Sequence, residues 1–298
     1  MHPAPERLLT LVDLTLEAVG CRVGIRCLDT AIAALVRAAF GALLRDDDGV
    51  ADVTYTAAAR AAGGYSLHCM GRERLIAADD SEFLMVLETE LSIELQTRRP
   101  DLFFIHGAAL EDEGRAVLLV GASGAGKSTA AWGLTHAGFG YLSDELSPID
   151  LQTLEVAPYA RALCLKAEPP ASHPVPSRTL RTVRTLHIPP GEMPGGRVDG
   201  PVPVHAIFFV DHREGTRWPS VEPVTRGEAA ARLLAQALNP LAHADDGLDA
   251  ASRIASAVPA FRLRTAALHA TSALVKTALV RATPVARDQP SSFATSKP

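Results

Sequence analysis

Residues 121–129 have the residue types and spacing of a phosphate-binding loop. They read Gly-Ala-Ser-Gly-Ala-Gly-Lys-Ser-Thr, and Gly121, Gly126, Lys127 and Ser128 occupy the positions that the motif requires. Glycines allow main-chain N–H groups to turn inward around a phosphate, while a helix N-terminus and a lysine ammonium add positive charge. The candidate nucleotide-binding residues are Gly121, Ala122, Ser123, Gly124, Ala125, Gly126, Lys127, Ser128 and Thr129.

Transfer of a terminal phosphoryl group also needs metal anchors and a group that takes the acceptor proton. The Ser128 hydroxyl is suited to Mg²⁺, and Asp144 and Glu145 form an adjacent acidic pair soon after the loop. We expect one of these acids to hold Mg²⁺ and the other to orient the acceptor hydroxyl. The alternative for the acids is a solvated strand end, and for the loop a glycine-rich turn before an ordinary helix.

Three basic side chains complete the candidate site. His106 lies on an apolar stretch near the loop, and we expect it to pair with Asp144 or to reach the metal; the alternative is a histidine of the core. Arg161 and Lys166 alternate with apolar residues and could supply charge to the γ-phosphate, with a pair of surface cations as the alternative.

The elements that must position these side chains begin with a hairpin. Residues 102–110 and 115–120 read as two strands joined by a polar turn, and the second strand leads directly into the loop and a helix at 128–136. A turn centred on Asp112 and Glu113 would set His106 opposite Leu119. A third strand over 138–146 would carry Asp144 and Glu145.

The first hundred residues read as a separate α+β unit. Alternating residues predict two strands over 11–25, and a helix follows with apolar residues between Ile32 and Leu43 on one face and Asp29 as its N-cap. Three short strands are expected over 53–76. A second helix should begin at Ser81 and end before Pro100. No motif for chemistry occurs here, so a scaffold or partner-recognition role is expected.

The remainder predicts loops, one buried strand and two more helices. Proline- and glycine-rich stretches at 168–177 and 189–203 are expected to be mobile loops, and 204–210 a buried strand. Thr225 and Glu228 have capping-box spacing for a helix at 226–238. An edge strand at 261–263 and a last helix ending at Leu279 follow. We therefore expect domains at 1–100 and 101–282, with a disordered tail at 283–298.

Composition narrows the classes of partner. The chain has 298 residues, of which 47% are hydrophobic and 21% charged, as in packed globular proteins. Its formal net charge of −5 argues against nucleic-acid binding driven by phosphate attraction. Four scattered cysteines predict neither a zinc site nor a disulfide framework. No membrane segment or secretory signal is apparent, and a cytoplasmic location is expected.

The order of these elements resembles the catalytic domain of HPr kinase/phosphorylase. The shared features are Ile105-His106-Gly107, a hairpin, the loop ending at Ser128, and Leu142-Ser-Asp-Glu145. The resemblance implies an α/β fold: a P-loop catalytic domain of HPr-kinase/PEP-carboxykinase type, with a mixed sheet and a hairpin leading into the P-loop, after an N-terminal α+β domain. It also implies a serine kinase that uses ATP and Mg²⁺, with His106 and Asp144 as the acid/base pair.

The match covers roughly residues 100–270 and departs from the family in two places. Glu145 stands where the family has Asp, and the family's Glu-x-Arg-Gly-x-Gly segment is absent, with Arg161 as its only remnant. We therefore expect the forward kinase reaction and not the reverse one. A divergent branch, in which some members accompany lasso-peptide gene clusters, is more similar to this chain and implies a peptide or protein serine as acceptor. Ring assembly in the family implies a homo-oligomer.

Three other functions remain open from the residues alone. The same loop would serve a nucleotide-switch ATPase, a kinase for a small molecule such as free serine, or a nucleotide-binding scaffold without activity. Intact Lys127, Ser128 and Asp144 speak against the scaffold, while the acceptor pocket would separate the two kinases.

Overall fold

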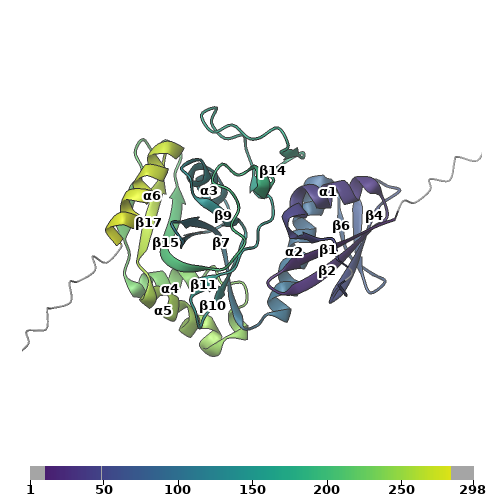
Figure 1. Ribbon diagram of the computed structural model, residues 1–298, viewed down its shortest axis with the longest axis horizontal. Coiled ribbons are helices and arrows are strands. Elements are labelled where there is room, and N and C mark those ends of the chain that lie inside the picture. Colours follow the sequence, from purple (N-terminus) through teal and green to yellow (C-terminus); the bar gives the residue numbers. More distant parts are fainter. Residues whose placement is uncertain (1–10, 48, 283–298) are drawn as a thin grey trace, which may run out of the picture.

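The computed structural model describes residues 11–47 and 49–282, which form two regions of mixed α/β structure (Figure 1). The expected disordered tail at 283–298 lies outside the described residues. No described helix is long and apolar enough to span a membrane.

The first region is a six-stranded sheet with two helices. Its strand order is β3-β1-β2-β4-β5-β6, with β2 and β4 parallel and the other neighbours antiparallel. The strands are β1 (Val12–Ala18), β2 (Cys21–Cys27), β3 (Leu44–Arg45), β4 (Val53–Ala59), β5 (Tyr65–Cys69) and β6 (Arg72–Ala77). The sequence predicted all of these except the two-residue β3.

Both helices of this region begin at aspartate caps. The Asp29 carboxylate accepts the N–H of Ala31 before α1 (Thr30–Phe40), which η1 (Gly41–Leu43) extends. Asp79 accepts the N–H of Glu82 at the start of α2 (Asp80–Arg98). Such caps satisfy main-chain donors that have no partner inside the helix. The Asp29 cap was predicted, and α2 begins one residue before the predicted Ser81.

The second region is built on an eight-stranded mixed sheet of order β11-β10-β7-β8-β15-β17-β16, with β9 also paired to β7. Its strands are β7 (Leu102–Asp112), β8 (Arg115–Val120), β9 (Gly140–Ser143), β10 (Leu146–Asp150), β11 (Glu155–Val156), β15 (Val202–His212), β16 (Ser220–Pro223) and β17 (Ala260–Thr265). A small sheet has the order β12 (Leu163–Leu165), β14 (Leu186–Ile188), β13 (Leu180–Arg181). The helices are α3 (Lys127–His136), α4 (Arg226–Leu234), α5 (Leu248–Ala257), α6 (Leu268–Ala282) and the short η2 (Pro190–Glu192), η3 (Pro240–Ala242) and η4 (Ala244–Gly247).

The hairpin into the loop is confirmed, but its register differs from the prediction by two residues. Asp112 pairs with Arg115 and Gly107 with Val120, so the turn is Glu113-Gly114 and not Asp112-Glu113. Both turn residues have positive φ, 53° and 77°, as two-residue hairpin turns of this kind require. A two-residue change keeps every side chain on its predicted face. It also sets His106 nearer the loop than expected.

Two further predictions about strands are wrong in detail. Asp144 and Glu145 do not lie inside a strand; the chain bends at these two residues as it passes from β9 to β10. The segment predicted as an edge strand is β17, which lies between β15 and β16. β16 has only four residues and none of them is fully buried, so its sequence is too short to show the alternation of apolar and polar residues that predicts a strand.

Buried side chains connect the two regions. The core of the first region continues into the second through Leu102, Phe104, Leu146 and Tyr159. Two other clusters cover the opposite faces of the larger sheet, one with α3 and α6 and one with α4 and α5. Division of the chain near residue 100 stays a prediction, because this shared core crosses it.

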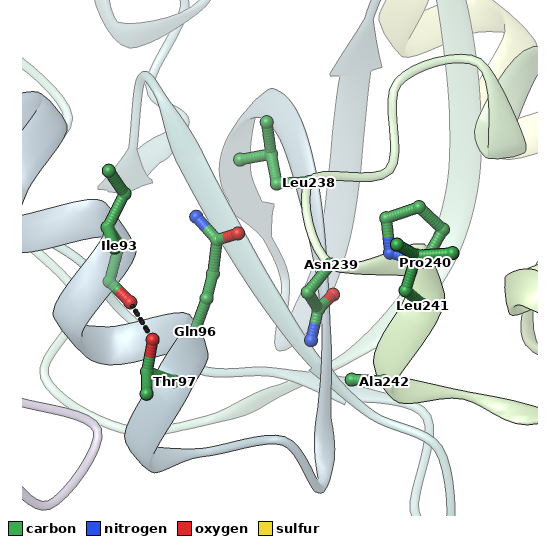
Figure 2. Close-up of a pocket in the computed structure, with 8 residues that line it drawn as sticks. All are labelled: Ile93, Gln96, Thr97, Leu238, Asn239, Pro240, Leu241 and Ala242. Atoms are coloured by element: carbon green, nitrogen blue, oxygen red, sulfur yellow. Dashed lines mark hydrogen bonds between the residues drawn. The ribbon is translucent and has the colours of Figure 1, made fainter.

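A second junction lies between α2 and the segment that follows α4. The Asn239 side chain donates to the carbonyl of Leu102 at 2.8 Å and accepts the N–H of Phe104 at 3.0 Å, which fixes this segment to β7. A hollow of about 320 Å³ separates it from Ile93, Gln96 and Thr97 of α2 (Figure 2).

Candidate functional site

The loop from Gly121 to Gly126 turns sharply before α3. Gly124 and Gly126 have φ values of 82° and 94°, a left-handed conformation that favours glycine. At Gly126 a Cβ atom would also lie 3.1 Å from the Cβ of His212, so glycine is required there for both reasons. No side chain caps α3, which leaves its first main-chain N–H groups free to face an anion.

The Lys127 ammonium is buried and fully engaged. It donates to the carbonyl oxygens of Gly121 at 2.7 Å and Ala122 at 3.2 Å, and its Nζ lies 2.9 Å from Nε2 of His106. Burial lowers the pKa of Lys127, and Glu145 and Asp144 act in the opposite direction. A phosphate at the loop would replace these neutral acceptors with a charged one.

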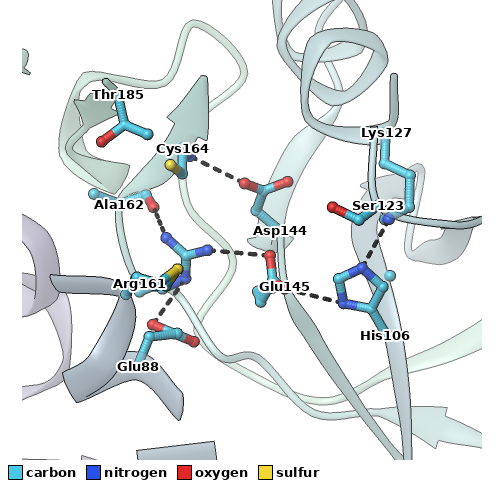
Figure 3. Close-up of polar contacts among 12 residues, drawn as sticks. Glu88, His106, Ser123, Lys127, Asp144, Glu145, Arg161, Ala162, Cys164 and Thr185 are labelled. Carbon is cyan, nitrogen blue, oxygen red and sulfur yellow. Dashed lines mark hydrogen bonds and ion pairs between the residues drawn. The ribbon is translucent and has the colours of Figure 1, made fainter. Parts of the chain in front are cut away.

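His106 pairs with Glu145, and not with Asp144 as the sequence led us to expect. Its Nδ1 lies 3.0 Å from Oε1 of Glu145, as Figure 3 shows, so Nδ1 carries the proton and Nε2 accepts from Lys127. The backbone explains this choice, because the N–H of Gly107 donates to the carbonyl of Glu145 at 3.3 Å. On its other side, a Cβ atom on Gly107 would lie 2.9 Å from the carbonyl of Leu119, so glycine suits the close packing of β7 against β8 here.

Glu145 is held between two basic groups. Arg161 contacts its Oε2 at 3.4 Å, on the side opposite His106. Burial alone would raise the pKa of Glu145, but the hydrogen bond from His106 and the charge of Arg161 lower it to about 2. Both oxygens of Glu145 are therefore engaged, so Ser128 and Asp144 are better candidates than Glu145 for the metal ligands that the sequence predicted.

Asp144 is buried more deeply than Glu145, and its pKa changes in the opposite direction. Its side chain is 1% exposed, and Oδ2 accepts the N–H of Cys164 at 3.0 Å. Oδ1 has no hydrogen-bond partner. Burial raises the pKa of Asp144, although Arg161 lowers it and the Ser128 hydroxyl contributes in the same direction. A carboxylate with a raised pKa and one free oxygen is suited to accept a proton or to bind a cation.

These donors fit Mg²⁺ better than a transition metal. Within the described residues, no group of three or more His, Cys, Asp or Glu side chains could hold a metal ion. Magnesium commonly takes one or two protein oxygens and completes its shell with phosphate oxygens and water. The Ser128 hydroxyl would be one such oxygen, and the free Oδ1 of Asp144 could either bind the ion or accept a proton, but not both at once.

Arg161 is a buried connector between Glu145 and Glu88, and its expected role toward the γ-phosphate stays a prediction. Its side chain is 7% exposed, and NH1 donates to the carbonyl of Ala162 at 3.0 Å. Its Nε lies 3.0 Å from Oε2 of Glu88 on α2 (Figure 3). The N–H does not point at that oxygen, so the contact is one of charge and not a hydrogen bond. Lys166 is exposed and lies 3.4 Å from the Ser123 hydroxyl, beside the loop.

Sequence reasoning missed Glu88. It lies in the first region, where no chemistry was expected, and burial raises its pKa from 4.5 to about 7 despite the opposing charge of Arg161. The available signal was an acid among the apolar residues of a predicted helix, which is costly unless the acid is paired.

A cavity of about 550 Å³ borders the loop, and most of these residues line it; Asp144 does not, but it contacts Cys164, which does. Ser123, Gly124, Gly126, Lys127, Ser128 and Thr129 line one side, next to His106, Glu145 and Arg161. Ser81, Met85, Glu88 and Thr89 of α2 line another side, and residues 164–187 around the small sheet complete the wall. Its volume suits a ligand of nucleotide or small-molecule size.

Comparison with known proteins adds little to this geometry. No family model and no curated protein matches the chain. A solved structure titled "Structure of the Hpr(Ser) kinase/phosphatase from Coxiella burnetii" is similar at 14% sequence identity and a TM-score of 0.30, over 60% of this chain and 93% of that one. At that level the similarity indicates only a distant fold relationship, and we take no residue role from it.

Proposed function

We propose that this protein is a kinase that transfers the γ-phosphoryl group of ATP to a hydroxyl, with serine of a peptide or protein as the acceptor. The observation that carries the proposal is the buried Asp144, whose free oxygen accompanies a complete phosphate-binding loop. The order of the His-Gly strand, hairpin, loop and Asp-Glu pair supports it, because it resembles the HPr kinase arrangement.

In the proposed reaction the acceptor oxygen bonds to the γ-phosphorus as the bond from that phosphorus to the β–γ bridging oxygen breaks. ADP leaves with the electron pair, and the hydroxyl proton passes to the Asp144 carboxylate. Lys127 and the free N–H groups of α3 would bind the phosphate oxygens. Bound Mg²⁺ would neutralise charge on the transferring group and would be held by the Ser128 hydroxyl, which leaves the free oxygen of Asp144 for the proton.

His106, Glu145 and Arg161 would position this machinery. Glu145 keeps the proton of His106 on Nδ1, and Nε2 therefore presents a lone pair to Lys127. Arg161 fixes Glu145 from the other side and lowers the pKa of both acids. The arrangement would orient the ammonium without adding a second positive charge beside it.

Incubation of the purified protein with γ-labelled ATP, Mg²⁺, and a panel of serine peptides and free serine tests the proposal. We expect label on an acceptor hydroxyl, and none with Lys127→Ala as the inactive control. Rapid release of free phosphate without transfer to any acceptor would contradict the proposal and identify a nucleotide-switch ATPase instead.

A further inference from the structure

Helix α2 lies beside both the cavity at the loop and the hollow shown in Figure 2. Met85, Glu88 and Thr89 line the cavity at the loop, and Ile93, Gln96 and Thr97 line the hollow against residues 238–242. The two sets follow one another along the same helix, and Figure 2 shows the second set facing Leu238 and Asn239. One side of α2 therefore connects the candidate active site with a second depression.

This side of α2 carries two exposed apolar side chains among polar ones. Met85, Thr89, Ile93 and Thr97 are all exposed and occur at every fourth position, and Met85 and Ile93 have 60% and 48% of their surface open. The hydroxyls of Thr89 and Thr97 donate to the carbonyls of Met85 and Ile93, at 2.9 and 2.8 Å. The donors of these two threonines are thus used by the helix itself, while Glu88 and Gln96 on the same side of α2 keep polar groups at the two hollows.

Two acidic side chains of α2 turn away from this Met85–Thr97 stripe. Glu90 and Glu94 both accept from the Tyr55 hydroxyl at 3.1 Å, and Glu90 is 6% exposed. The core-facing side of α2 is apolar, as in other packed helices, with Phe83, Leu84, Leu87, Leu91 and Leu95 buried. Met85 and Ile93 remain outside that core, and they leave an apolar surface beside the two hollows that a ligand could cover.

The facing wall is apolar and rigidly held. Leu238 and Leu241 have 38% and 83% of their surface exposed. The segment between them is anchored to β7, since the N–H of Leu238 donates to the carbonyl of Phe104 at 2.8 Å and Asn239 bonds to both Leu102 and Phe104. A pre-formed wall loses little entropy when a ligand binds.

We propose that the acceptor is a polypeptide that extends along the Met85–Thr97 stripe, with its hydroxyl in the loop cavity and an apolar side chain in the hollow between α2 and Leu238–Ala242. This inference rests on the proposed kinase function and selects a peptide acceptor over a small molecule. From Glu88 to Gln96 the helix rises about 12 Å. An extended chain covers that distance in about four residues, which no single amino acid can do.

The test uses a mixture of random peptides with one fixed central serine, and N-acetylserine amide as the short acceptor. We expect the wild-type protein to phosphorylate peptides that carry Leu, Ile, Met or Phe about four residues from the serine. Ile93→Asp should lower kcat/KM for these peptides about tenfold or more, because a charge enters the apolar contact. Leu241→Asp, on the facing wall, should have the same effect. Val280→Asp is the matched control, on an exposed position of α6.

Capture of the same peptides by immobilised protein with a non-transferable ATP mimic separates this inference from the kinase proposal. Capture that both Ile93→Asp and Leu241→Asp weaken relative to Val280→Asp supports the stripe even if no transfer occurs, and absence of transfer contradicts only the kinase. Equal capture by all variants, no capture by the wild type, or equal kcat/KM for N-acetylserine amide and the peptides would overturn the inference. Thermal unfolding checks that each variant is folded.

Discussion

The loop side and the α2 side of the cavity are built in different ways. Residues 121–129 are contiguous, and their conformation follows from glycines and from the start of α3. The α2 side belongs to the first region and is joined to the second by the ion pairs Glu88–Arg161 and Asp79–Arg184. Under the two proposals above, the chemical groups lie on the loop side and the acceptor surface lies on the α2 side, so variants should separate catalysis from acceptor binding.

Lys127→Ala should have the largest effect, on the loop side alone. The variant loses the ammonium that would meet the phosphates, and we expect nucleotide affinity to fall by about a hundredfold or more. Titration with a fluorescent ATP analogue measures this loss. Retention of wild-type affinity would mean that the loop does not hold the phosphates.

Asp144→Asn should follow in size and act on transfer rather than binding. A neutral amide cannot accept the hydroxyl proton, so we expect the turnover number to fall by about a hundredfold while ATP remains bound. Single-turnover transfer and ATP titration, measured on the same preparation, separate the two quantities. Full turnover in this variant would remove Asp144 from the role of base.

His106→Ala should have an intermediate effect. Lys127 would keep its two carbonyl acceptors and lose its contact with Nε2, while Glu145 would lose its partner at Oε1. We expect a decrease in turnover of about tenfold, within the range for groups that orient a site. An unchanged rate would show that this histidine is only a packing residue.

Glu88→Gln should have the smallest effect on catalysis and a clear effect on pH dependence. The pKa of Glu88 is raised from 4.5 in the unfolded chain to about 7 in the fold, so the folded state retains a proton that the unfolded state releases. The wild-type free energy of unfolding should therefore fall between pH 4.5 and pH 7, by about 3 kcal/mol relative to the variant. Urea unfolding at several pH values measures this difference, and parallel curves for both proteins would contradict it.

The sequence was most informative where structure is determined by neighbours in the chain. The Asp29 cap and the hairpin depend on residues a few positions apart, and the structure has both, although the hairpin register differs by two residues. Phosphate binding by residues 121–129 stays a prediction, which the left-handed φ values of Gly124 and Gly126 support. The His106–Glu145 pair depends on how β7 and the bend after β9 align across the sheet. Nothing local distinguishes Asp144 from Glu145 as its partner.

The α2 side of the cavity could not be predicted from sequence motifs, for a different reason. Glu88 and Arg161 are 73 positions apart, and their contact exists only because the two regions share a core. Met85 and Ile93 are visible in the sequence as apolar residues of a helix, but their exposure is not. Helical periodicity assigns apolar residues to the interior, which is correct for residues such as Leu87 and Leu91 and does not show which apolar residues stay outside.

The full engagement of Lys127 has a consequence for selectivity. An incoming group must compete with two carbonyl oxygens and an imidazole nitrogen that already hold the ammonium, so it gains only the difference in interaction strength. A doubly charged phosphoryl group would compete well in that exchange, while a neutral alcohol or a water molecule would gain almost nothing. Under the proposed function, Lys127 would therefore discriminate against uncharged ligands and in favour of groups with a high density of negative charge.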